Sequence, residues 1–295
     1  MAKPRNTKIF EGRTAGRTAR PPRVEFREFQ TPSSGIFFKA GRALYSGKSA
    51  YQKIEVIDNA SYGRVLFLDG LVQTTDRDEF FYHEMLAHPA LTTHPRPRSL
   101  LIVGGGDGGL LHQVLAYPLE RVVLCEIDPR VIEVSKAYFP WLGPGLRDRR
   151  VELVLADANI FALGCRERFD IILVDSSDPV GPSAVLHQRR FYERLKKILK
   201  PEGVIAAQAG SLLLHLEIFQ RKNAFLKKMF SVVRFYLGPA PTYPGGTWCY
   251  NYLSRRCDPL RLRRRPPAAL RYYNREIHEA AFSLPNVLKD GLNRA

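Results

Sequence analysis

The stretch S-L-L-I-V-G-G-G-D-G-G, from Ser99 to Gly109, decides the fold of this chain. It opens with Leu100 to Val103, a short apolar run of the kind that forms a buried parallel strand. The glycines that follow let the backbone turn sharply and approach a ligand closely, because no Cβ intervenes. Apolar residues at helical spacing begin at Leu110, so the turn joins a strand to a helix. In that context a glycine-rich turn is typical of nucleotide binding.

Acidic residues in and after this turn indicate the charge of the ligand. Gly104, Gly106 and Gly109 fit the pattern G-x-G-x-x-G, and Glu126 ends the next apolar run about 20 residues later. An acidic side chain at that place binds ribose hydroxyls. Asp107 lies inside the turn, where a carboxylate repels an anionic ligand group and attracts a cationic one. The pattern therefore predicts a positively charged nucleoside rather than NAD.

The composition is that of a soluble globular enzyme, with 45% hydrophobic and 25% charged residues in 295. No run approaches the ~18 apolar residues of a membrane span, and no apolar signal-peptide core is present, so we expect no membrane association. The cysteines form no C-x-x-C pair, and we expect reduced thiols in a cytoplasmic protein. They are Cys125, Cys165, Cys249 and Cys257.

The net charge of +16 is concentrated in two stretches. Residues 1–25 carry a net charge of +5 and residues 255–275 a net charge of +7, which leaves +4 for the rest. The basic residues thus lie away from the motifs, which are rich in Asp and Glu. This distribution favours a solvated charged rim over an RNA or DNA surface.

The chain divides into three parts. Residues 1–25 are rich in Arg and Thr without hydrophobic periodicity, which predicts a flexible basic arm. Apolar and polar side chains alternate from Ile36 to Thr75, and Asp69-Gly70 between two apolar runs predicts a hairpin, so we expect residues 26–75 to form a small N-terminal antiparallel β-hairpin domain. Asp76 and Glu79 resemble a capping box that starts a helix. Residues 76–295 form the expected Rossmann-like catalytic domain.

This catalytic domain alternates strands and helices, which predicts an α/β fold with a seven-stranded, methyltransferase-type sheet and helices on both faces. The last two strands are joined without a long helix, so they are expected to pair antiparallel. The expected strands are 100–103, 121–125, 151–155, 169–174, 203–207, 232–237 and 247–253. The expected helices are 110–117, 129–138, 189–199 and 214–230.

Carboxylates follow four consecutive strands of the expected sheet. Asp107, Glu126 and Asp157 follow the first three, and the loop D-S-S-D-P-V-G-P after the fourth contains Asp175 and Asp178. Ligands of such sheets bind outside the carboxyl ends of the strands. Crowded like charges destabilise a fold unless a cation binds among them. The set predicts a site for a cationic ligand, although any one of these residues alone could be a helix cap.

A histidine pair near the start of the domain resembles a zinc-protease signature, but with different spacing. His83 and His88 are five residues apart, which separates them by about 140° around a helix, against about 40° in H-E-x-x-H. We therefore predict no metal site.

Five motifs in this order resemble spermidine synthase and related polyamine aminopropyltransferases. They are Tyr82-His83-Glu84-Met85, G-G-G-D-G-G, C-E-I-D (Cys125 to Asp128), D-S-S-D-P-x-G-P and P-T-Y-P-G-G (Pro241 to Gly246). The resemblance runs from about residue 36 to the C-terminal segment. It implies transfer of a 3-aminopropyl group from decarboxylated S-adenosylmethionine to an amine, with release of methylthioadenosine. It also implies a homodimer or homotetramer without a tightly bound cofactor.

The resemblance implies a role for each matching residue. For the donor, Gly104 and Gly106 form the turn, Glu126 and Ile127 hold the ribose, Asp157 and Ala158 the adenine, and Gln52 and Asp107 the aminopropyl tail. For the amine, Asp175 with Tyr82 binds the attacking nitrogen and takes its proton. Asp178 lies toward the far end of the amine, Tyr243 orients it, and His83, Gln73 and Gln208 are neighbours in the pocket.

The acceptor and the reaction class leave alternatives open. Putrescine is the first expectation, but Gly210 and Ser211 stand where many relatives carry an acidic residue, so agmatine, cadaverine and spermidine remain candidates. Leu199-Lys-Pro-Glu-Gly-Val resembles a segment of class I methyltransferases, which makes an S-adenosylmethionine-dependent methyltransferase the enzymatic alternative. A basic RNA-associated protein is the alternative from another class.

Overall fold

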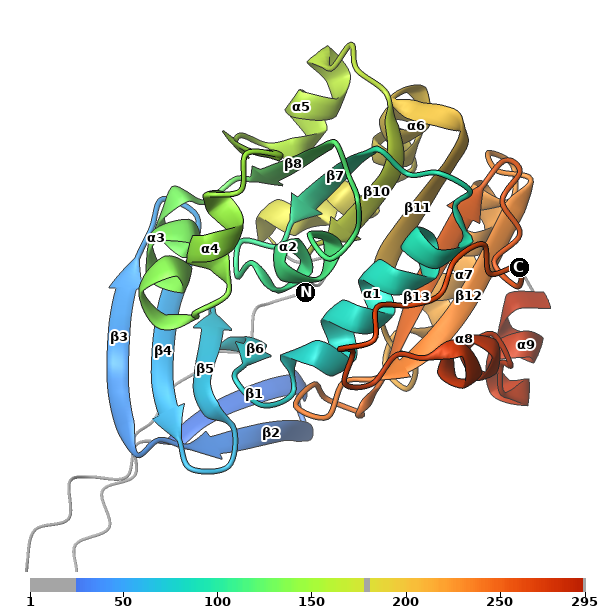
Figure 1. Cartoon of the computed structure of the whole chain (residues 1–295). Coiled ribbons are helices and arrows are strands. Elements are labelled where there is room, and N and C mark those ends of the chain that lie inside the picture. The colour runs from blue at the N-terminus through green and yellow to red at the C-terminus, as the bar shows by residue number, and fades with distance from the viewer. Residues whose placement is uncertain (1–24, 178–180, 294–295) are drawn as a thin grey trace, which may run out of the picture. The chain divides into compact units, whose positions relative to one another are not determined.

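The structure, a computed structural model, describes residues 25–177 and 181–293. The chain forms two compact units, Met1–Asp78 and Glu79–Ala295, which we call the N-terminal and the C-terminal unit (Figure 1). Apart from Glu25, the expected flexible arm lies outside the described residues, as does Asp178. Among the described helices, none combines the length and the hydropathy that crossing a bilayer requires.

The N-terminal unit consists of two antiparallel sheets. The first pairs β1 (Glu25–Thr31) with β2 (Ser34–Lys39). The second contains, in sequential order, β3 (Arg42–Lys48), β4 (Lys53–Asn59), β5 (Gly63–Leu68) and β6 (Leu71–Thr75). Asp69 and Gly70 join β5 to β6 with φ angles of 50° and 81°, which a two-residue type I′ hairpin turn requires at both positions. The small antiparallel β domain and its hairpin are therefore confirmed.

The expected capping box is wrong. The first helix, α1 (Glu79–Thr93), begins at Glu79, and Asp76 belongs to the N-terminal unit. Its Oδ2 accepts hydrogen bonds from the backbone nitrogen of Arg64 at 2.9 Å and from Arg64 Nε at 2.8 Å. Asp76 thus stabilises the strand it faces in β5 rather than the helix that follows it in sequence.

The C-terminal unit is built on a seven-stranded sheet. Its strands are β7 (Ser99–Gly104), β8 (Arg121–Glu126), β9 (Val151–Leu155), β10 (Phe169–Asp175), β11 (Leu199–Ser211), β12 (Val232–Pro239) and β13 (Thr247–Ser254). Their order in the sheet is β12-β13-β11-β10-β7-β8-β9. The strands from β11 to β9 pair in parallel, whereas β13 pairs antiparallel with both β11 and β12. The expected seven-stranded α/β sheet with its antiparallel final pair is confirmed.

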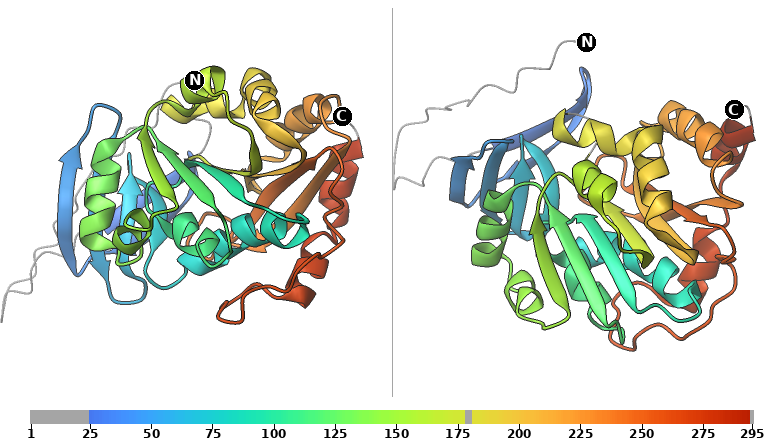
Figure 2. Two further views of the ribbon diagram at one scale, coloured as in Figure 1. Left: turned by 45° about the horizontal axis from the view of Figure 1, so that its top comes forward. Right: turned by 90° about the horizontal axis from the view of Figure 1, so that it is seen from above.

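Helices cover both faces of this sheet (Figure 2). Besides α1 they are α2 (Gly109–Val114), α3 (Pro129–Tyr138), α4 (Leu142–Leu146), α5 (Ala158–Gly164), the 3₁₀ helix η1 (Gly181–His187), α6 (Arg189–Lys197), α7 (Leu216–Leu226), α8 (Arg275–Ala281) and α9 (Asn286–Asn293). One core contains side chains of α1, α2, α4 and α8, and the other contains side chains of α5, α6 and α7.

Alternation along β7 explains why its sequence is apolar throughout. Leu100 and Ile102 pack in the first core, and Leu101 and Val103 pack in the second. Successive side chains of a strand point to opposite faces, so a strand covered on both sides needs apolar residues at every position. Burial of each such side chain stabilises the fold by about 1.5–3 kcal/mol.

The C-terminal segment fixes α1 through one buried carboxylate. Glu84, 2% exposed, accepts hydrogen bonds from the backbone nitrogens of Arg271, Tyr272 and Tyr273 at 2.9, 2.9 and 2.7 Å. Farther along the helix, Thr92 Oγ1 is 2.8 Å from the hydroxyl of Tyr273. Because α1 also carries Tyr82 and His83, these contacts position two residues of the expected site.

Candidate active site

The glycine-rich turn brings the ends of β7 and β10 into close contact. Gly104 pairs with Asp175 in the parallel ladder and has a φ of 76°. A Cβ at Gly104 would overlap the backbone carbonyl oxygen of Asp175, and glycine adopts this φ at no steric cost. The first glycine of the motif therefore allows the carboxylate at the end of β10 to lie beside the turn.

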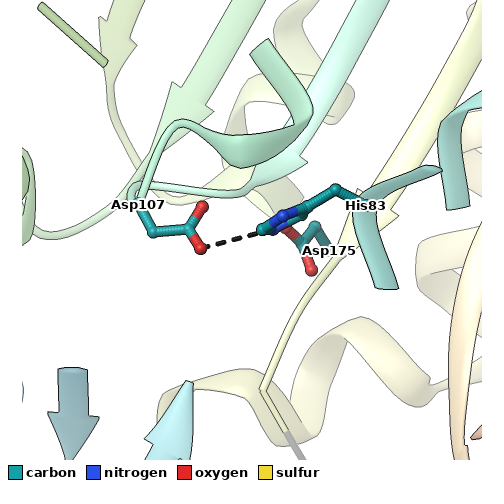
Figure 3. Close-up of side chains that lie close together, drawn as sticks. All are labelled: His83, Asp107 and Asp175. Carbon is teal, nitrogen blue, oxygen red and sulfur yellow. Dashed lines mark ion pairs between the residues drawn. The ribbon is translucent and has the colours of Figure 1, made fainter. Parts of the chain in front are cut away.

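Asp107 occupies the middle of this turn and lies beside a histidine of α1 (Figure 3). Its Oδ1 accepts a hydrogen bond from the backbone nitrogen of Gly109 at 3.0 Å. Its Oδ2 is 3.3 Å from Nε2 of His83. A Cβ at Gly109 would overlap the His83 ring, so the last glycine of the motif makes room for this pair.

His83 is held between two carboxylates. Its Nδ1 is 2.7 Å from Glu79 Oε2, one helical turn earlier, while its Nε2 faces Asp107. Burial alone would lower the pKa of His83, but Asp107 and Glu79 together raise it well above 6.5. The imidazolium form, with both nitrogens donating, is therefore favoured at neutral pH. The sequence analysis missed Glu79 in this role, although its i, i+4 spacing from His83 was a usable signal.

Tyr82 and Asp175 form the second pair of the site. The Tyr82 hydroxyl donates a 2.6 Å hydrogen bond to Asp175 Oδ1. Burial, together with the negative charge of Asp107, raises the pKa of Asp175 to about 6, although His83 and the Tyr82 hydrogen bond act in the opposite direction. A carboxyl group that titrates near neutral pH is suited to accept a proton during catalysis.

Glu126 lies at the end of β8, the next strand in the sheet. It is 8% exposed, and its Oε1 accepts a hydrogen bond from the backbone nitrogen of Asp128 at 2.9 Å. Burial raises the pKa of Glu126 to about 7, while backbone hydrogen bonds from Asp128 and Ile127 lower it. A Cβ at Gly106 would lie 3.0 Å from Glu126 Oε2, so the glycine turn also borders this carboxylate.

Asp157 follows β9 and caps the next helix. Its Oδ1 accepts hydrogen bonds from the backbone nitrogens of Asn159 at 2.7 Å and Ile160 at 3.3 Å. Capping, the alternative kept open for any single acid of the set, is therefore confirmed for Asp157. Its side chain is half-buried, and the neighbouring Ala158 is buried at the first turn of α5.

Gln208 and Tyr243 lie on the other side of Asp175. Gln208, 2% exposed, donates through Nε2 to the carbonyl oxygen of Ser176 at 2.6 Å and accepts from Trp248 Nε1 at 3.2 Å. Its amide thus holds the backbone that follows Asp175. The Tyr243 ring lies 5.4 Å from the Tyr82 ring and 4.8 Å from the Trp248 ring, between centroids. The sequence analysis did not single out Trp248.

The structure gathers three of the expected residues at one point. Ligand atoms of His83, Asp107 and Asp175 lie within 4.8 Å of one another, so two carboxylates and one histidine meet at this point. His88 belongs to a different network, with Nδ1 2.8 Å from the Tyr117 hydroxyl and Nε2 3.1 Å from Gln113 Oε1. The two expected residues of the N-terminal unit are Gln52, which precedes β4, and Gln73, which lies in β6.

Two family models together cover most of the chain. Residues 79–260 match the spermine/spermidine synthase domain, and residues 25–76 match the spermidine synthase tetramerisation domain. The second match supports self-association of the chain.

Curated relatives agree with these matches. The chain is 42% identical over 272 residues to a polyamine aminopropyltransferase of Moorella thermoacetica, which covers 91% of this chain and 96% of that one. A polyamine aminopropyltransferase of Shouchella clausii is 40% identical over 268 residues, covering 90% of this chain and 98% of the relative.

Solved structures share the fold. A crystal structure of spermidine synthase in complex with the transition state analogue AdoDATO has a TM-score of 0.88 and 37% identity, over 92% of this chain and 96% of that chain. Spermidine synthase from Thermotoga maritima has a TM-score of 0.85 and 36% identity, over 92% of this chain and 94% of that chain. With a hydrogen-bonded Tyr-Asp pair beside a glycine-rich turn and carboxylates at successive strand ends, this chain belongs to the spermine/spermidine synthase family of polyamine aminopropyltransferases.

Proposed function

We propose that the chain transfers the 3-aminopropyl group of decarboxylated S-adenosylmethionine to a small amine and releases methylthioadenosine. The observation that carries this proposal is the hydrogen-bonded Tyr82–Asp175 pair, whose carboxylate has a pKa of about 6 and lies beside Asp107. Asp175 is thus suited to take a proton, and Asp107 is suited to bind a cation.

In the proposed donor site, the glycine turn with Gly104 and Gly106 admits the nucleoside, the Glu126 carboxylate accepts hydrogen bonds from the ribose hydroxyls, and Ile127 borders the nucleoside. Asp157 and Ala158 border the adenine, with the Asp157 carboxylate accepting from the exocyclic amine. The role that the resemblance gives to Gln52 stays a prediction.

Asp107 is proposed to select the decarboxylated donor. The ammonium of the aminopropyl tail pairs with this carboxylate, whose Oδ2 lies 3.3 Å from His83 Nε2 in the structure. Ordinary S-adenosylmethionine carries a carboxylate next to that ammonium. This carboxylate would lie beside the carboxylate of Asp107, and the repulsion between the two negative charges disfavours its binding.

The proposed reaction is a direct displacement. The amine nitrogen, after losing its proton to Asp175, attacks the methylene carbon next to the sulfonium. A carbon–nitrogen bond forms, the carbon–sulfur bond breaks, and its electron pair neutralises the sulfur as a thioether. The protein supplies alignment and a proton acceptor, with Tyr82 holding the carboxylate in place. This chemistry needs neither a metal nor a resident cofactor.

For the acceptor we propose putrescine first, with agmatine, cadaverine and spermidine as the other candidates. His83 and Tyr243 flank the Tyr82–Asp175 pair and are proposed to contact the amine, and Gln208 to fix the loop beside it. The roles of Gln73, and of Asp178 at the far end of the amine, stay predictions. A cytoplasmic homodimer or homotetramer is the proposed working form.

The test incubates the purified chain with decarboxylated S-adenosylmethionine and each of the four amines. Mass spectrometry of the amine product and of methylthioadenosine establishes the reaction and the preferred acceptor. S-adenosylhomocysteine formed from ordinary S-adenosylmethionine, without turnover of any amine, would instead assign the chain to the methyltransferases.

A variant pair excludes a contaminating host enzyme. Asp175→Asn removes the proton acceptor and is expected to lower turnover by ~10² or more while methylthioadenosine binding is retained. Glu193→Gln removes an exposed carboxylate that pairs with Arg189 on α6 and is expected to keep full activity. Equal turnover in both variants would contradict the proposed role of Asp175.

A further inference from the structure

A basic pocket lies in the C-terminal unit, in the segment between β13 and α8. Its volume is about 620 Å³, and the residues that line it fall between Leu262 and Arg275. Four of them are arginines: Arg263, Arg264, Arg265 and Arg275. These residues lie outside both matched family domains, which end at residues 76 and 260. The two matched domains therefore do not include this pocket.

The arginine-bearing wall of the pocket is fixed to the end of α1. The backbone nitrogens of Arg263 and Arg264 lie 2.8 and 3.2 Å from the carbonyl oxygen of Thr92. The Arg264 guanidinium donates through Nη2 to the carbonyl oxygens of His94 at 3.1 Å and Pro95 at 2.9 Å. A pocket whose backbone is already held binds a ligand with a smaller entropic cost.

Two of the four arginines that line the pocket, both exposed, have no ion-pair partner among the described residues. Arg275 pairs with Glu279 at 2.9 Å, but Arg263 and Arg265 form no ion pair within residues 25–177 and 181–293. The Nε of Arg264 is buried and has no hydrogen-bond partner in the same part of the chain. Clustered like charges repel one another, so an anion bound beside the exposed Arg263 and Arg265 would relieve this repulsion.

The rest of the lining indicates the size and the nature of this anion. Apolar side chains, among them Pro266 and Leu270, complete the pocket beside the arginines. A volume of about 620 Å³ is that of a site for a small organic molecule rather than for a single ion. Arginine binds phosphate oxygens through two parallel hydrogen bonds, which makes it the usual residue for phosphate recognition.

We propose that this pocket binds the phosphate groups of a small organic polyphosphate of nucleotide size. The site is separate from the catalytic one, because Thr92 lies ten residues beyond Tyr82 on α1, about 15 Å along the helix axis. The arginines contact the phosphates, and the prolines and Leu270 pack against the organic part. The inference does not depend on the aminopropyl transfer.

Titration calorimetry of the full chain tests the proposal, with inorganic triphosphate, adenosine triphosphate and adenosine as probes. Saturating methylthioadenosine keeps the adenosine moiety out of the donor site. We expect inorganic triphosphate to bind, adenosine triphosphate to bind more tightly, and adenosine not to bind. Arg263→Gln combined with Arg265→Gln should weaken triphosphate binding at least tenfold.

A matched variant distinguishes binding in the pocket from attraction of triphosphate by the net positive charge of the segment. Arg255→Gln combined with Arg256→Gln also removes two positive charges from this arginine-rich stretch, but neither residue lines the pocket. We expect this variant to bind triphosphate within threefold of the unchanged chain. Circular dichroism of both variants checks that they are folded.

Three results would overturn the proposal. One is the absence of triphosphate binding at millimolar concentration, and another is equal weakening in the two double variants. The third is tighter binding of a single-stranded RNA than of adenosine triphosphate, lost equally in both variants, which would assign the arginines to a nucleic-acid surface.

Discussion

Replacing Tyr82 by Phe removes the hydroxyl that donates a 2.6 Å hydrogen bond to Asp175. That hydrogen bond lowers the pKa of Asp175, but burial and the charge of Asp107 outweigh it, so the pKa with the bond in place is about 6. A hydrogen bond to a charged group contributes about 1.5–3 kcal/mol, and one pKa unit corresponds to about 1.4 kcal/mol. Loss of the bond should therefore raise the pKa of Asp175 by about one to two units, to about 7–8.

The assay is the pH profile of kcat/KM for the amine at saturating donor. A raised carboxyl pKa means that Asp175 is ionised, and able to accept a proton, only at higher pH. At pH 7 the ionised fraction falls from about 90% to about 10–50%, so the rate should fall about two- to tenfold and recover near pH 9. The acid limb of the profile moves to higher pH by the same one to two units.

Tyr250→Phe is the matched control. Its ring centroid lies 5.7 Å from that of Tyr82, and its buried hydroxyl has no hydrogen-bond partner in the described part of the chain. This variant should keep the acid limb of the unchanged protein. If Tyr82→Phe lowers the rate equally at every pH, then Tyr82 orients the amine and does not set the proton affinity of Asp175, and the reasoning is refuted.

Three further variants test the remaining parts of the site. Asp107→Asn should weaken the decarboxylated donor more than methylthioadenosine, measured by calorimetry, because only the donor carries the ammonium; an equal loss would contradict this role. Methylthioadenosine affinity should rise as the pH increases through about 7, where Glu126 becomes ionised, and Glu126→Gln should abolish this rise. Glu84→Gln places an amide donor against a backbone N–H, which should lower the free energy of unfolding by about 2–3 kcal/mol and the melting temperature by about 5–10 °C. The control Glu276→Gln, at an exposed position, should leave the melting temperature unchanged. Equal melting temperatures of the two variants would contradict the role of Glu84 in fixing α1.

Local patterns in the sequence predicted the sheet and the carboxylates at its edge. The apolar run before Gly104 and the acids after each strand follow from strand burial and from the geometry of parallel sheets, and neither needs knowledge of distant contacts. The turn at Asp69-Gly70 was predictable for the same reason, because two neighbouring residues determine its geometry.

Contacts between distant residues could not be predicted in this way. Tyr82 and Asp175 are 93 positions apart, and only the folded chain shows which oxygen the hydroxyl meets. Asp76 has the spacing of a helix cap, yet its carboxylate accepts hydrogen bonds from Arg64, twelve positions earlier in the chain. The pKa of His83 depends on burial and on two carboxylates together, and the spacing of residues in the sequence does not reveal their combined effect.

The carboxylate of Glu84 has a consequence for how the enzyme is made. Residue 271, the first of its three backbone donors, leaves the ribosome 178 residues after α1 is complete. At typical elongation rates of roughly 5–20 residues per second, this interval lasts about 9–36 s. During that time Glu84 lacks the three backbone donors that it has in the folded protein. The helix that bears Tyr82 and His83 therefore reaches its final packing only at the end of synthesis, so premature termination before residue 271 leaves it without its anchor.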